Sequence, residues 1–100
     1  MNKIKYYVKQ IEDELDGAKD YIEKALEYKV RNDNIRYTKY KEMSMQELGH
    51  ASNLHEFAVQ DIDELQRVYP EIPQEMLDAW EHAHKVFVEK AAWIRQMQAM

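Results

Sequence analysis

Cysteine is absent from the 100-residue chain, and glycine and proline occur only twice each. The lack of cysteine excludes disulfides, thiolate metal sites and cysteine nucleophiles. Because glycine and proline are scarce and Glu, Lys, Gln, Met and Ala are common, the composition favours an all-α chain. No apolar run approaches the ~18 residues that a membrane span needs, so no membrane partner is predicted.

Basic residues are also fewer than acidic residues, with 14 against 19, so the net charge is -5. A basic stripe is the usual footprint of nucleic-acid binding, and its absence predicts no nucleic-acid partner. The start of the chain, residues 1–5, lacks the apolar core of a signal peptide. We therefore expect a single domain, residues 1–100, located in the cytoplasm.

Hydrophobic periodicity predicts three helices, over about residues 2–30, 35–68 and 73–98. In the first of them, an apolar residue recurs every seven positions, as expected for one buried helix face: Ile4, Ile11, Ala18 and Ala25. Residues 31–34 interrupt this pattern and predict a turn, with Asp33 or Asn34 as the N-cap of the second helix. Because this link is short, the first two helices should form an antiparallel hairpin.

A second row on the first helix combines aromatic residues with one carboxylate: Tyr7, Glu14, Tyr21 and Tyr28. An unpaired charge near a buried stripe is costly, so Glu14 needs a partner. The second helix carries Glu47-Leu48-Gly49-His50, in which a carboxylate and an imidazole lie three residues apart. That spacing places Glu47 and His50 on one helix face, where both could contact the same metal ion.

The register of the predicted hairpin brings these residues together. Residues at equal distance from the turn face each other, and the midpoints are (14+47)/2 = 30.5 and (14+50)/2 = 32. Both midpoints fall at the turn predicted from composition. Two carboxylates that close together repel each other unless a proton or a cation lies between them. We therefore predict a metal site formed by Glu14, Glu47 and His50.

Carboxylates combined with one imidazole suit iron or manganese and can also accept zinc. A dinuclear site in a four-helix bundle needs two lone carboxylates and two Glu-x-x-His units. One hairpin supplies half of that set, and two hairpins related by a two-fold axis supply all of it. The sequence therefore predicts a homodimer, or a larger even-numbered homo-oligomer, in which dimerisation completes the four-helix bundle and the metal site.

The order Glu14, Tyr21, Glu47-x-x-His50 resembles the first half of the ferritin-like di-iron proteins, a superfamily that includes ferritins, bacterioferritins and rubrerythrins. The resemblance covers the first two predicted helices, about two-thirds of the chain. It implies Glu14 as a terminal ligand, Glu47 as a bridging ligand and His50 as the nitrogen ligand. It also implies Tyr21 as a hydrogen-bond partner of the ligands, and oxidation of Fe(II) by dioxygen or peroxide for iron storage or detoxification.

The chain departs from full-length ferritins because only one further helix follows the hairpin. That helix contains Glu81-x-x-His84, which we expect to be a solvated or rim pair, with metal ligation as the lesser alternative. In size the chain is most similar to encapsulated ferritins, whose helical pair dimerises to complete the iron site. This resemblance implies a host compartment shell as a further partner. Leu48, not a methionine, follows Glu47, so no haem is predicted.

Two other functions remain open at this stage. The first is a dimerising structural or interaction protein without a functional metal site, such as a phage or regulatory assembly component. The second is an enzyme on the same scaffold that uses peroxide or manganese.

The remaining candidates have simpler expected roles. We expect His55 at the surface or rim and His82 exposed, and Gly49 to permit the close approach of a neighbour. The aromatic residues are most simply expected in the core and the dimer interface, which for Tyr21 is the alternative to its implied role at the site: Tyr7, Tyr21, Tyr28, Trp80 and Phe87.

Overall fold

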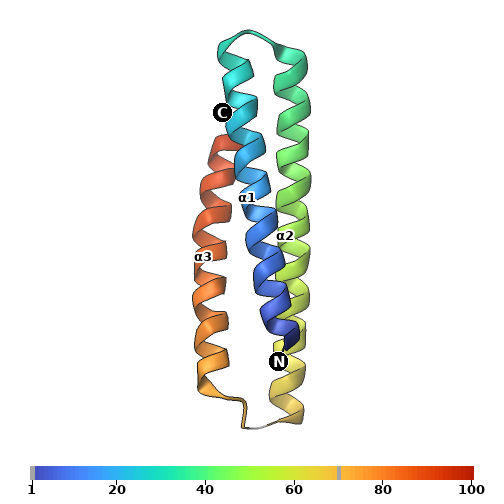
Figure 1. The fold of residues 1–100 in the computed structure, drawn as a ribbon, viewed down its shortest axis with the longest axis vertical. Coiled ribbons are helices and arrows are strands. Elements are labelled where there is room, and N and C mark those ends of the chain that lie inside the picture. Colours follow the sequence, from blue (N-terminus) through green and yellow to red (C-terminus); the bar gives the residue numbers. More distant parts are fainter. Residues whose placement is uncertain (1, 70) are drawn as a thin grey trace.

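The computed structural model describes residues 2–69 and 71–100, which form three α-helices (Figure 1). Helix α1 spans Asn2–Val30, α2 spans Asn34–Val68 and α3 spans Gln74–Gln98. The predicted all-α class is confirmed for these residues, and each helix bound lies within one residue of the predicted range. None of the three helices in the described ranges combines the length and the apolar composition that a membrane span requires.

The turn between α1 and α2 is closed by backbone hydrogen bonds and a side-chain cap. Asn32 has a φ of 59°, in the left-handed region that asparagine tolerates better than most residues. The Asn32 and Asp33 N–H groups donate to the carbonyls of Lys29 and Tyr28, at 3.1 and 3.0 Å, which terminates α1. The Asp33 carboxylate then accepts a hydrogen bond from the Arg36 N–H and caps α2, as one of the two predicted N-caps.

The three helices lie side by side as a rod of 56 × 17 × 16 Å (Figure 1). Helix α2 runs antiparallel to α1, and α3 returns parallel to α1 from the far end of α2. A 35-residue helix is ~52 Å long, so α2 alone accounts for the length of the rod. Helix α3 packs on its own hairpin, and it contacts α1 more extensively than α2.

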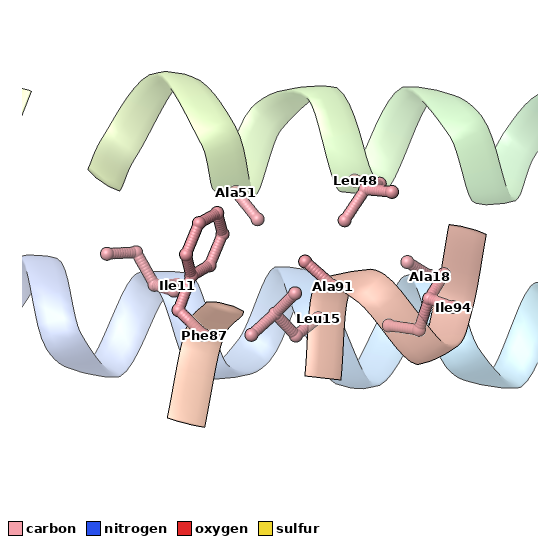
Figure 2. Packing of buried hydrophobic residues seen from close by; sticks show 8 residues of the cluster. All are labelled: Ile11, Leu15, Ala18, Leu48, Ala51, Phe87, Ala91 and Ile94. Atoms are coloured by element: carbon pink, nitrogen blue, oxygen red, sulfur yellow. The ribbon is translucent and has the colours of Figure 1, made fainter. Parts of the chain in front are cut away.

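The core lies where the three helices meet (Figure 2). It is a continuous cluster of buried apolar side chains from all three helices: Ile11, Leu15, Ala18, Leu48, Ala51, Phe87, Ala91 and Ile94. Leu15 and Ile94 are almost fully buried, and such burial is worth about 1.5–3 kcal/mol for each side chain. The alanines let the helices approach closely, which explains how a 100-residue chain can bury a core along a long rod.

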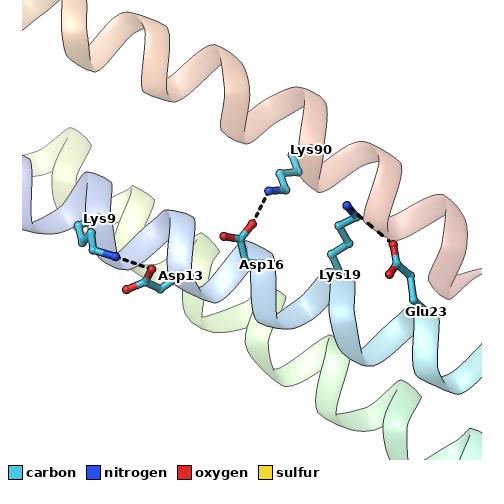
Figure 3. A network of polar contacts seen from close by, with 6 residues as sticks. All are labelled: Lys9, Asp13, Asp16, Lys19, Glu23 and Lys90. Atoms are coloured by element: carbon cyan, nitrogen blue, oxygen red, sulfur yellow. Dashed lines mark hydrogen bonds and ion pairs between the residues drawn. The ribbon is translucent and has the colours of Figure 1, made fainter.

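Polar contacts also position α3 against α1 (Figure 3). Lys90 of α3 forms an ion pair with Asp16 of α1 at 2.5 Å, and Lys19 lies over the Trp93 ring at 5.5 Å. Exposed pairs of this kind contribute at most about 1 kcal/mol, so they orient α3 more than they stabilise it.

Helix α3 therefore covers one face of the hairpin and leaves the opposite face open. Glu14 lies two residues before Asp16, which is roughly 200° around the helix from the side that α3 contacts. On α2, His50 is similarly turned away from Leu48, which packs into the three-helix core. We call this uncovered side the open face. Its members are Tyr7, Glu14 and Tyr21 of α1, and Met43, Glu47, His50 and Phe57 of α2.

Candidate metal centre

Glu14, Glu47 and His50 meet on the open face, as the hairpin register predicts. One ligand atom from each residue, two carboxylate oxygens and one imidazole nitrogen, lies within 4.8 Å of the other two. Glu14 comes from α1, and Glu47 and His50 come from one turn of α2. We call these three residues the hairpin site. Within the described residues, they are the one group of three potential ligands that converges in this way.

Glu14 has an oxygen that is shielded from water but not satisfied by the protein. Its Oε2 atom is buried and has no hydrogen-bond partner. The Nδ1 atom of His50 lies 3.6 Å from this oxygen, which is within ion-pair distance but too long for a hydrogen bond. Leaving a carboxylate oxygen buried and unpaired costs free energy, so this position favours a cation.

The neighbouring Glu14 carboxyl group also changes the protonation of Glu47. A hydrogen bond between the Glu47 and Glu14 carboxyl groups, which requires a shared proton, is the main cause that raises the pKa of Glu47. Partial burial and the charge of Glu14 raise this pKa further, while the nearby His50 opposes the shift. Glu47 thus retains its proton more strongly than an isolated glutamate side chain does. A divalent cation could replace that proton and relieve the repulsion.

Gly17 provides the space that Glu47 occupies. A Cβ atom at position 17 would lie 3.3 Å from Oε2 of Glu47, tighter than an ordinary van der Waals contact. The glycine that was expected to permit a close approach was Gly49, and this prediction is wrong. A Cβ atom at Gly49 would meet nothing within 4 Å, because Gly49 is on the solvent side of α2.

The hairpin site is more exposed than the sequence predicted. The apolar stripes of both helices indicated ligands facing an apolar interior, but the His50 side chain is 58% exposed and that of Glu14 is 24% exposed. The difference arises because α3 packs on the opposite face and no described element covers the open face. Within one chain, the site is therefore a half-site at a surface.

Tyr21 belongs to an aromatic group beside the hairpin site. Its ring lies 6.2 Å from the ring of Tyr40, which stacks on Tyr28 at 5.6 Å and an interplanar angle of 9°. These contacts fit the simpler expectation of a packed aromatic residue. The implied hydrogen bond from Tyr21 to the ligands stays a prediction.

The second Glu-x-x-His motif does not join the hairpin site. His84 of α3 instead contacts His55 of α2, with Nδ1 of His84 and Nε2 of His55 separated by 2.6 Å. The His55 ring is half-buried and stacks on Phe87 at 4.3 Å, so His55 lies at the rim of the contact between α2 and α3, within the expected surface or rim position. Glu81 and His82 are exposed on α3, as expected.

Two features of these sites were not predicted from the sequence, namely the position of Gly17 beside Glu47 and the contact between His55 and His84. Gly17 lies one turn after Glu14 on the same side of α1, so helical spacing alone could have placed it beside the ligands. His55 and His84 are 29 residues apart, and no local pattern connects them.

Comparison of the chain with protein-family models, curated proteins and solved structures finds no match. The function of the chain is therefore inferred from the geometry and chemistry of the hairpin site.

Proposed function

We propose that this chain is a ferritin-like metal-binding protein, in which two open faces pack together and build a dinuclear iron site from two hairpin sites. The observation that carries the proposal is the convergence of Glu14, Glu47 and His50 within 4.8 Å, combined with a buried Glu14 oxygen that has no hydrogen-bond partner. The donor set of two carboxylates and one imidazole fits iron or manganese and can accept zinc.

In this proposal each residue of the hairpin site has a distinct task. Glu14, with its shielded oxygen, would hold one metal ion, and Glu47 would be the carboxylate shared between the two ions, as the resemblance to ferritin-like proteins implies. His50 would supply the nitrogen ligand from the same turn of α2 as Glu47. Bound iron would supply the one-electron chemistry by which Fe(II) is oxidised by dioxygen or peroxide, serving iron storage or detoxification.

Dimerisation follows from the ligand count. One hairpin site supplies three ligands, and a second copy related by a two-fold axis supplies three more. The open face also carries apolar side chains that a second copy would cover, including Phe57, which is 49% exposed, and Met43, which is 36% exposed. A four-helix bundle of two hairpins, with each α3 on the outside, would bury these residues. A cytoplasmic compartment shell would be the further partner.

The test is iron binding and oxidation by His50→Ala compared with the unaltered protein. After aerobic loading with Fe(II), we expect about one iron per chain and rapid formation of Fe(III), measured by mass spectrometry and absorbance. His50→Ala should lose most of the iron and slow the oxidation at least about tenfold, because it removes the nitrogen ligand. His82→Ala is the matched control, since His82 is exposed on α3 away from the site.

Oxidation by His50→Ala at the rate of the unaltered protein would contradict the proposal. The alternative function would then be favoured, a helical dimerising structural or interaction protein such as a phage or regulatory component. In that case the contact between Glu14 and His50 serves only the packing of the open face.

A further inference from the structure

A second group of potential metal ligands lies on the other side of the molecule, between α2 and α3. His55 of α2 and His84 of α3 direct ring nitrogens at each other across 2.6 Å. With both rings neutral, one N–H group donates to the lone pair of the other ring. This contact joins α2 to α3, which pack against each other less extensively than the other helix pairs.

Aromatic side chains hold this pair of imidazoles in place. The His55 ring stacks on Phe87 with an interplanar angle of 12°, and it lies 5.4 Å from the Trp80 ring. Trp80, His84 and Phe87 all belong to α3, and they recur at spacings of four and three residues along one side of that helix. His55 is therefore inserted into a slot formed by three aromatic rings of α3, which restricts the direction of its Nε2 atom.

The chemistry of the pair suits a metal ion, because the imidazole nitrogen of histidine is a common metal ligand in proteins. The His55 ring is half-buried between α2 and α3, so its nitrogen is partly shielded from water.

We propose that His55 and His84 form a second metal site, separate from the hairpin site, that binds a borderline divalent ion such as Zn²⁺ and ties α3 to α2. Imidazole is a preferred ligand of zinc, copper and nickel. Two nitrogens on one tetrahedral zinc ion lie ~3.3 Å apart, given Zn–N distances near 2.0–2.1 Å. The rings therefore need to separate by less than ~1 Å, and the exposed His84 side chain has room for that movement.

Metal binding at this pair needs no net release of protons. The hydrogen that lies between the two rings would move to the distal nitrogen of its own ring, leaving both facing lone pairs for the metal. Water would complete the coordination. The ion would thereby replace one hydrogen bond with two metal–ligand bonds that connect two helices, so its binding should stabilise the packed position of α3.

The experiment measures Zn²⁺ binding in the double variant Glu47→Ala/His50→Ala, which lacks most of the hairpin site. We expect this variant to bind about one Zn²⁺ per chain, by equilibrium dialysis with mass spectrometry, and to melt at a higher temperature with Zn²⁺ than with a chelator. Adding His84→Asn should weaken Zn²⁺ binding at least about tenfold and remove the thermal shift. Adding His82→Asn instead should change neither, because His82 lies on the same helix but outside the pair.

His84→Asn is preferred to a substitution of His55, since His84 is exposed and its replacement should spare the stacking of His55 on Phe87. Two results would overturn the proposal: no stoichiometric Zn²⁺ in the double variant, or equal binding with and without His84. Because the hairpin site is disabled throughout, either result leaves the proposed iron function untouched. Conversely, loss of iron chemistry in His50→Ala does not bear on the pair of His55 and His84.

Discussion

At the scale of single residues, Glu47 should determine how the stability of the metal-free protein depends on pH. The pKa of Glu47 is raised in the folded state, mainly by its hydrogen bond with Glu14. At pH values between the ordinary and the raised pKa, an acid whose pKa is raised by folding binds more protons in the folded state than in the unfolded state. The resulting stabilisation is fully present below the ordinary glutamate pKa of about 4.3 and is lost as pH rises through the raised value.

We therefore expect the stability of metal-free Glu47→Gln to lack this fall with rising pH. At pH 7 the variant should be more stable than the unaltered protein. Chemical denaturation at several pH values in the presence of a chelator measures the difference. With a bound divalent metal the order should reverse, because glutamine cannot replace a bridging carboxylate. If metal-free Glu47→Gln is less stable at pH 7, the repulsion between Glu14 and Glu47 does not dominate at this site.

At the scale of elements, Ser44 connects all three helices. Its side chain is fully buried on α2, where the hydroxyl donates to the Ala18 carbonyl of α1 at 2.6 Å. The same oxygen accepts a hydrogen bond from the Gln98 amide of α3 at 2.9 Å. A buried polar side chain with both partners satisfied specifies the relative position of the helices more sharply than apolar packing does.

Ser44→Ala removes both hydrogen bonds and should lower the free energy of unfolding by about 1–3 kcal/mol. Gln98→Ala removes only the contact to α3 and should cost less. In the double variant the two effects should not add, because the bond from Gln98 is already lost when Ser44 is replaced. Urea denaturation of the two single variants and the double variant measures this coupling, and fully additive losses would mean that the bond between Ser44 and Gln98 contributes nothing.

The elements also show which features the sequence could predict. The turn at residues 31–33 follows from composition, and it fixes the hairpin register, so the convergence of Glu14 with Glu47 and His50 could be derived by arithmetic. The exposure of His50 could not, because it depends on which face α3 covers. The contact between His55 and His84 likewise depends on the packing of α2 against α3. Periodicity assigns residues to a helix face, but it does not identify the neighbour of that face.

At the scale of the whole molecule, the proposed iron site requires two chains to associate through the open face. The apolar members of this face include Met43 and Phe57, which lie on α2 seven residues before and after His50. That spacing places all three on one side of the helix. Two such faces packed about a two-fold axis would bury both apolar positions beside each pair of ligands.

Phe57→Glu should therefore weaken the dimer strongly, because it would bury a carboxylate without a partner at the interface of both chains. Val59→Glu is the matched control. Val59 is 37% exposed on the same helix, but it lies two residues further on and hence faces roughly the opposite side. Sedimentation at micromolar concentration should show a dimer or larger even oligomer for the unaltered protein and Val59→Glu, and a monomer for Phe57→Glu.

Iron binding should be lost with the dimer, since each monomer retains only three ligands. A Phe57→Glu dimer that binds iron normally would place the interface elsewhere, and a monomer that still binds about one iron per chain would show that a single hairpin suffices.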